Sequence, residues 1–231
     1  MSKKYEFTGE TKTIGDTVLR RIRALRKIPG VCQPGGLGGW IEKEKNLSHD
    51  GNAWVYGDAR VYGDARVHGN ARVHGDARVH GNARVHGNAR VYGDARVHGN
   101  AWVYGDARVS GNARVSGNAR VSGNARVSSG HWEISPLQIQ GSRHFLTTSS
   151  PTEVTIGCET HSVEHWEQHY RKIGRNHEYT DQETEEYRFY LHAAANYLKQ
   201  YVQDVPACPT CNVLLTHDHG KCPECGETYE V

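Results

Sequence analysis

The stretch Gly51-Asn-Ala-Trp-Val-Tyr-Gly-Asp-Ala-Arg-Val-Tyr62 decides the fold, because it contains the first two copies of a hexapeptide that recurs up to Ser128. The consensus is Gly-Asn/Asp-Ala-Arg-Val-Tyr/His/Ser, and thirteen copies follow one another without an insertion. Valine occupies the fifth position of every copy: 55, 61, 67, 73, 79, 85, 91, 97, 103, 109, 115, 121 and 127. A fixed period kept over this length indicates a repeat architecture.

Each copy alternates apolar and polar residues, which predicts a short strand with one buried face. Gly-Asn or Gly-Asp then supplies a turn. An antiparallel meander of hairpins would place His opposite Ala and Arg opposite Val, so that each sheet face would mix apolar and charged side chains. A parallel coil places Val on Val, Ala on Ala and Arg on Arg. Only the coil buries one apolar face, so we predict a mainly β fold, a parallel β-solenoid.

An aliphatic residue at every sixth position, with a small residue four places later, resembles the left-handed parallel β-helix of hexapeptide-repeat proteins. The resemblance implies left-handed coils of three hexapeptides each. Thirteen copies would then make a little over four coils, about 20 Å tall at ~4.8 Å per layer. The open ends of such a coil need caps, because unpaired strand edges associate with other chains.

The segment before the repeats predicts an N-terminal cap. Strands are expected at 5–14 and 17–26 around Gly15-Asp16, followed by a glycine-rich turn, Gly35-Gly-Leu-Gly-Gly-Trp-Ile41, whose Trp40 would cover the end of the core. The order of Tyr5–Thr11, Arg21–Arg26, Leu37–Glu42 and Asn46–Ser48 before the hexapeptides resembles an uncharacterised, acetyltransferase-like hexapeptide-repeat family of bacteriophage and prophage genomes. The resemblance covers about residues 4–130 and implies a phage or prophage origin.

The segment after the repeats predicts a mixed α+β cap. Short strands are expected at 137–142, 143–149 and 153–158, then a helix from about Ser162 to Ile173 that ends at Gly174. A second helix opens with the capping box Thr180-Asp-Gln-Glu183 and ends before Pro206. The predicted organisation is therefore an N-terminal β cap (1–46), a hexapeptide β-helix (47–134), an α+β C-terminal cap (135–205) and a zinc ribbon (206–231).

The zinc ribbon rests on two CxxC pairs near the C-terminus. Four thiolates at this spacing can surround one tetrahedral Zn²⁺, and a closed four-cysteine site implies a structural role. The four predicted ligands are Cys208, Cys211, Cys222 and Cys225. A second metal site is a weaker alternative, in which Cys158 joins three histidines spaced four apart, His161, His165 and His169; a solvated polar face is the competing interpretation.

The solenoid is basic. Residues 51–128 contain eleven Arg and five Asp, whereas the whole chain has a formal net charge of only +2. With three copies per coil, one face carries Arg60, Arg78, Arg96 and Arg114 beside Asp58, Asp76 and Asp94. The other two faces have more Arg than Asp, and they carry the candidate ligand-binding residues: Arg66, Arg84, His86, Trp102, Tyr104 and Arg120 on one, and Arg72, Arg90 and Arg108 on the other. Stacked guanidinium groups repel one another and invite anions, from another subunit, a ligand or nucleic acid.

The sequence thus predicts a non-enzymatic, phage-type β-helix protein that captures an anionic partner, either a protein factor or a nucleotide-like ligand, and that could counteract host defence. A homotrimer is expected from the resemblance, which also leaves open an acyl-CoA-dependent acyltransferase with a histidine base. Binding of nucleic acid through the Arg columns and zinc ribbon is the second alternative. The clustered cysteines and the absence of a signal peptide or a long apolar run predict a cytoplasmic protein without membrane association.

Overall fold

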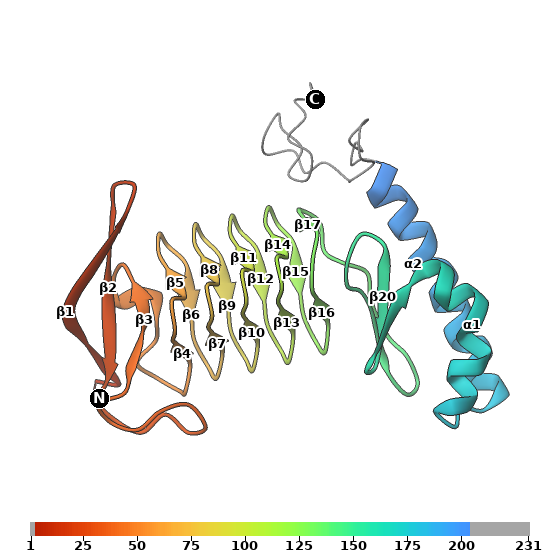
Figure 1. Ribbon diagram of the computed structural model, residues 1–231, viewed down its shortest axis with the longest axis horizontal. Coiled ribbons are helices and arrows are strands. Elements are labelled where there is room, and N and C mark those ends of the chain that lie inside the picture. Colours follow the sequence, from red (N-terminus) through yellow and green to blue (C-terminus); the bar gives the residue numbers. More distant parts are fainter. Residues whose placement is uncertain (1–2, 204–231) are drawn as a thin grey trace. The chain divides into compact units, whose positions relative to one another are not determined.

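The computed structural model describes residues 3–203, which form two compact units that divide between Gln138 and Ile139. The first unit opens with the antiparallel strands β1 (Tyr5–Ile14) and β2 (Thr17–Ala24), followed by β3 (Leu37–Ile41) and a 3₁₀ turn at Glu44–Asn46. The coils come next, stacked one after another (Figure 1). Their strands are two residues long: β4 (Trp54–Val55), β5 (Arg60–Val61), β6 (Arg66–Val67), β7 (Arg72–Val73), β8 (Arg78–Val79), β9 (Arg84–Val85), β10 (Arg90–Val91), β11 (Arg96–Val97), β12 (Trp102–Val103), β13 (Arg108–Val109), β14 (Arg114–Val115), β15 (Arg120–Val121), β16 (Arg126–Val127) and β17 (His131–Trp132).

The strands pair in parallel with partners three hexapeptides along the chain, and this confirms the coil rather than the meander. Arg78 pairs with Arg96 and Val79 with Val97, in a register that recurs throughout the repeats. Three faces result, and we name them after the strands β5, β6 and β7, which follow one another in the sequence and lie on different faces. The β5 face contains β3, β5, β8, β11, β14 and β17; the β6 face contains β6, β9, β12 and β15; the β7 face contains β4, β7, β10, β13 and β16.

The core of the solenoid is a stack of valine and alanine. Every repeat Val and Ala between 53 and 127 is at most 1% exposed. The backbone hydrogen bonds join successive coils, as from the Arg78 amide to the Ala95 carbonyl at 2.9 Å. The turn glycines are required for two reasons, a positive φ and a close contact with the next coil. Gly87 has a φ of +69°, and a Cβ built on it would lie 2.9 Å from the amide nitrogen of Gly105 in the next coil, so the corners of adjacent coils touch backbone to backbone.

Side chains close the first coil where the preceding strand is missing. Asn46 is fully buried, and its Nδ2 donates to the carbonyls of Gly63 (3.1 Å) and Ala65 (2.9 Å). The buried Lys4 ammonium donates to the Ala53 carbonyl at 2.7 Å, and burial lowers the pKa of Lys4 to about 8. These donors occupy positions that a further coil would fill, which blunts the open edge.

The last coil is closed in a complementary way. Trp132 pairs with Val115, so its ring continues an inward-facing valine column and is fully buried. The Arg120 amide donates to Ser135 Oγ and the Ser122 amide to Gln138 Oε1, at 2.9 and 2.8 Å. Our prediction that Trp40 covers the core end was wrong, because Trp40 pairs with Arg60 in an outward-facing column. Trp132 closes the opposite end.

The second unit contains a four-stranded sheet, β18 (Gln138–Gln140), β19 (Phe145–Thr148), β20 (Glu153–Ile156) and β21 (Glu159–Ser162), and two helices, α1 (Val163–Asn176) and α2 (Asp181–Gln203). The predicted strands and helices are present, but β21 was missed and α1 continues past Gly174. The capping box forms as predicted: the Glu183 amide donates to Thr180 Oγ1, and the Thr180 amide donates to Glu183 Oε2. No helix of the described residues has the length and apolar composition needed to cross a bilayer.

Candidate binding face on the solenoid

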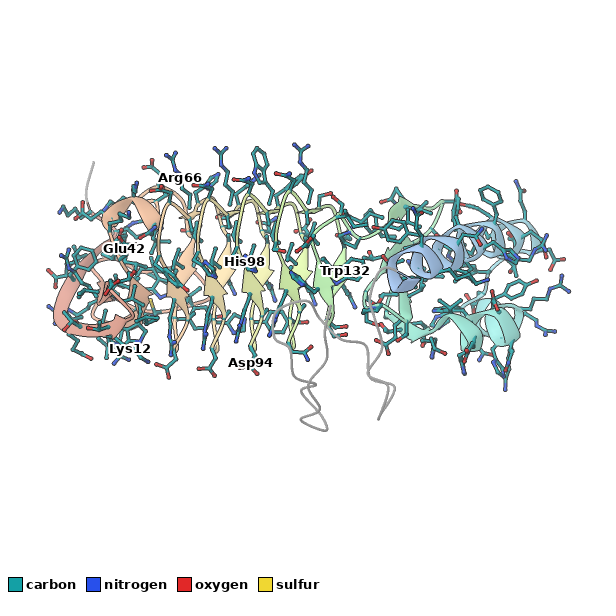
Figure 2. All side chains as sticks on the ribbon, turned by 90° about the horizontal axis from the view of Figure 1, so that it is seen from above. Lys12, Glu42, Arg66, Asp94, His98 and Trp132 are labelled. Atoms are coloured by element: carbon teal, nitrogen blue, oxygen red, sulfur yellow. The ribbon has the colours of Figure 1, made fainter. Side chains whose placement is uncertain are left out.

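The predicted Arg columns exist on all three faces, because the parallel register places each outward residue over its equivalent in the next coil. On the β6 face, Arg66 pairs with Arg84, Arg84 with Trp102, and Trp102 with Arg120. Arg66 projects away from the coils, on the edge opposite Asp94 (Figure 2). The β6 face therefore brings together the first group of candidate ligand-binding residues.

Trp102 lies between two guanidinium groups. The Cζ atoms of Arg84 and Arg120 are 4.8 and 5.3 Å from the centre of its ring. A cation over each side of an indole is a favourable arrangement, worth about 0.5–1 kcal/mol per pair at an exposed site. The indole also separates the two charges by a further coil, which reduces their repulsion. The tryptophan thus allows arginines to remain above and below it in the same column.

An aromatic column runs beside these arginines. The His86 ring stacks on Tyr104 with centroids 5.2 Å apart and on His68 at 4.9 Å, and it meets Trp102 edge to face at 6.3 Å. Burial, followed by the neighbouring Arg84, lowers the pKa of His86, so this ring is uncharged near neutral pH. The positive charge of the β6 face therefore comes from its arginines.

The carboxylate that the sequence placed on the β6 face is neutralised from elsewhere. Asp64 forms ion pairs with Lys45 (2.5 Å) and Lys43 (3.7 Å), and the hydrogen bond from Lys45 is the main reason that the pKa of Asp64 is lowered. Within residues 3–203, Arg66, Arg84 and Arg120 form no ion pair within 4.0 Å, and all three are exposed. An open depression lined by Glu44, Lys45 and His49 adjoins Arg66.

The β7 face carries the second candidate group in an unbroken column, Arg72, Arg90, Arg108 and then Arg126. Arg72 donates to the carbonyl of Pro29 at 3.4 Å. At the corner between the β7 and β5 faces, Asp58 is engaged by the N-terminal cap, through Lys12 at 3.7 Å and the Trp40 indole N–H at 3.4 Å. The three faces thus differ in which of their charges already have partners.

The repeat histidines form ring stacks at the ends of the strands. His80 lies between Tyr62 and His98, with centroids 4.8 and 5.0 Å away. Burial, His98 and nearby arginines lower the pKa of His80 to about 4. A neutral imidazole can accept a proton, but the described structure shows no carboxylate bonded to His68, His74, His80 or His86 that would orient it as a base.

The predicted second metal cluster forms a stack of rings. His161 and His165 lie 4.4 Å apart between centroids, and His165 and His169 lie 4.3 Å apart. His161 Nε2 bonds to Glu159, and His169 Nδ1 bonds to the His165 carbonyl. No group of three or more His, Cys, Asp or Glu side chains in residues 3–203 is placed to hold a metal ion. The predicted zinc ligands, Cys208 to Cys225, lie outside the described residues.

A small pocket in the second unit was not predicted. Glu159 bridges His161 and His177, with both Nε2 atoms 3.0 Å from its oxygens, and these bonds lower the pKa of Glu159. Glu159 and His177 line the pocket together with Cys158, Trp166 and Tyr179. His177 follows α1 in the sequence and Glu159 precedes it, so no local pattern links the pair. Likewise, nothing in the sequence around Lys4 or Asn46 indicates that they cap the first coil.

Comparison with known proteins supports the repeat assignment. A family model described as the YdcK β-solenoid repeat matches residues 53–69, 59–75, 89–105, 101–117, 107–122, 113–129 and 119–133. None of the curated proteins compared with the chain matches it. All the matched segments lie among the coils, from β4 to β17. The coils of this chain are therefore similar to the YdcK β-solenoid repeat.

Proposed function

We propose that the chain is a non-enzymatic β-solenoid binding protein that captures an anionic partner on its β6 face. The observation that carries the proposal is the stack of Arg84, Trp102 and Arg120, two exposed guanidinium groups held on one indole. Guanidinium groups bind phosphate and carboxylate through two parallel hydrogen bonds. A phosphate-bearing, nucleotide-like ligand or an acidic protein segment has the required chemistry.

The rigidity of the coils supports this proposal. The arginine backbones are fixed by hydrogen bonds to the coils on either side, so their spacing of ~4.8 Å does not change when a ligand binds. A preformed row of cations loses less conformational entropy on binding than a row on a flexible loop. Because the chain resembles a phage family, the proposal includes that capture of a nucleotide-like signal counteracts host defence.

The experiment is a thermal-shift and calorimetric comparison of nucleotides, an acidic peptide, duplex DNA and acyl-CoA. The test variant is Arg84→Glu/Arg120→Glu on the β6 face. The matched control is Arg60→Glu/Arg78→Glu on the β5 face, which makes the same change in net charge. We expect one class of anion to bind the wild-type protein and the control, and to bind the β6 variant at least tenfold more weakly.

The alternatives give different results. Equal losses in both variants would indicate attraction to net charge alone and would contradict a specific site. DNA binding that falls steeply with salt in the wild-type protein would favour the nucleic-acid alternative. Turnover of acyl-CoA would establish the acyltransferase. No binding of any of the four classes would end the proposal.

Several sequence-based expectations remain part of this proposal. The hexapeptide spacing supports left-handed coils, and the phage resemblance supports a cytoplasmic location in a host cell. The cysteine pairs Cys208/Cys211 and Cys222/Cys225 support a structural zinc ribbon.

A further inference from the structure

The β7 face and its following corner carry three parallel columns. The first is the arginine column of the β7 face. The second is a stack of rings, in which His74 lies 4.8 Å from Tyr56 and 5.1 Å from Tyr92 between centroids. The third column, two residues after the rings, consists of the exposed carboxylates Asp58, Asp76 and Asp94. Cation, aromatic and anion columns therefore lie side by side over two successive coils, at residues 72–76 and 90–94, because the preceding coil carries the buried Trp54 in place of an arginine.

The carboxylate column distinguishes this corner from the other two. Elsewhere the equivalent positions are mostly asparagines that bond to one another from coil to coil, as from Asn70 Nδ2 to Asn88 Oδ1 at 3.1 Å and from Asn82 Nδ2 to Asn100 Oδ1 at 3.2 Å. Carboxylates cannot satisfy one another in this way, and at one coil of separation they repel. Asp58 pairs with Lys12, but Asp76 and Asp94 form no ion pair within the described residues.

The arginines of the β7 face are similarly without charged partners. In residues 3–203, Arg90 and Arg108 form no ion pair within 4.0 Å. Among the described residues, Arg90 forms no ion pair with Asp94 of its own coil, and Tyr92 lies between the two in the sequence. A partner for this surface must therefore present anions to one side of an aromatic strip and cations to the other.

We propose that the partner is a second copy of this chain, placed side by side and pointing in the same direction. The two copies are related by a two-fold axis that runs parallel to the solenoid and passes over the ring column. Rotation about this axis exchanges the two sides of the ring column and keeps each residue at the same position along the solenoid. It places the rings of one copy on the rings of the other and each arginine column on the partner's carboxylate column. Such a self-complementary surface is what a two-fold interface requires.

The sequence sets the vertical register of this contact. Arg72 and Asp76 belong to one coil, and so do Arg90 and Asp94. Rotation about the parallel axis thus pairs Arg72 with the partner's Asp76 and Arg90 with the partner's Asp94, twice each. Both columns have the same pitch because the same coils generate them. Copies that run in opposite directions would instead place arginine on arginine.

The size of the surface predicts the strength of the contact. The four strands β7, β10, β13 and β16 span about 19 Å at ~4.8 Å each, because Trp54 of β4 is buried, and five outward and corner residues span about 16 Å. Two such patches bury roughly 600 Å² in total, which is below the size of a standard specific interface. We therefore expect a weak, reversible dimer with a Kd in the upper micromolar range, which weakens as salt screens the charges.

The test is a charge swap measured by sedimentation equilibrium of the full chain at low and high salt. Arg90→Asp and Asp94→Arg should each weaken the dimer at least tenfold. The double variant Arg90→Asp/Asp94→Arg should restore it, because the exchanged charges again face their complements. Arg84→Asp on the β6 face is the matched control and should leave the dimer unchanged. Restoration by the second substitution also excludes misfolding as the cause of the loss.

A cross-link tests the axis itself. A residue on a two-fold axis meets its own copy, so Tyr92→Cys should form a disulfide dimer on mild oxidation, whereas Tyr104→Cys on the β6 face should not. Three outcomes of the sedimentation experiment would each overturn the proposal. They are the mass of a single chain at all concentrations, no rescue by the double variant, and the mass of three chains that the charge swap does not change. The β6 arginines are intact in every β7 variant, so failure here leaves anion capture unaffected.

Discussion

Arg84 and Trp102 are three hexapeptides apart in the sequence, yet the Cζ atom of Arg84 lies 4.8 Å from the centre of the Trp102 ring. The contact follows from the period of the coil, because residues three hexapeptides apart occupy the same place on consecutive coils. Arg120 completes the arrangement from the other side. The position of Trp102 between two cations is therefore a consequence of the repeat length.

This arrangement predicts that Trp102→Leu destabilises the solenoid. The substitution keeps an apolar side chain but removes two cation–π contacts, so the free energy of unfolding should fall by about 1–2 kcal/mol. Urea unfolding followed by circular dichroism measures the change. Trp102→Tyr keeps a ring and should lose less; equal losses for Leu and Tyr would contradict a role for the ring.

The columns themselves could be predicted from the sequence, because a strict period leaves few parallel registers that bury valine and alanine together. Both helices and the order of the strands other than β21 could likewise be predicted, from alternation and from the Thr180–Glu183 capping box. The side-chain contacts that close the first coil could not be predicted: Lys4 and Asn46 reach carbonyls of residues 53, 63 and 65 in a way that no periodicity encodes.

The sequence also did not predict which charged side chains of the candidate site pair with the N-terminal cap. Asp64 counts as a charge of the β6 face in the sequence, but Lys43 and Lys45 of the N-terminal cap neutralise it. Trp40 was placed over the core because it follows a glycine run, whereas the parallel register with Arg60 turns its side chain outward. Both outcomes depend on how the cap docks, and the repeat carries no information about that.

The turn glycines predict unequal effects of the same substitution. Gly87→Ala would place a Cβ 2.9 Å from the Gly105 amide at a φ of +69°, whereas Gly15 has a positive φ but no atom within 4 Å of an added methyl group. We expect Gly87→Ala to lower the melting temperature clearly more than Gly15→Ala, because it adds a backbone clash to the conformational strain that both share. Similar losses would show that crowding between coils is unimportant.

The ring stacks predict a loss of stability in acid. The pKa of His80 is about 4 in the folded protein against an ordinary value of 6.5, so the unfolded chain binds the proton more readily. The stability contributed by neutral His80 is therefore present above pH 6.5 and is lost as the pH falls towards 4. His80→Tyr, a residue found at equivalent positions, should reduce this loss in thermal unfolding from about pH 7 down to about pH 4. An identical pH profile would contradict the assignment.

The cysteine pairs predict one tightly bound zinc ion per chain. Cys208→Ser or Cys222→Ser should abolish stoichiometric zinc in the purified protein, because each removes one of four thiolates. Cys158→Ser is the matched control and should retain the metal. Elemental analysis after gel filtration gives the ratio. Zinc retained in both ribbon variants would show that the metal is held elsewhere, or by other ligands.

The end caps have a consequence for how such a chain can change in length. Lys4, Asn46, Ser135 and Gln138 bond to carbonyls and amides that every coil presents in the same geometry. Deletion or duplication of three consecutive hexapeptides would offer the same groups to the same side chains. The protein can thus gain or lose whole coils, and with them charged residues of each column, while both end caps keep their contacts.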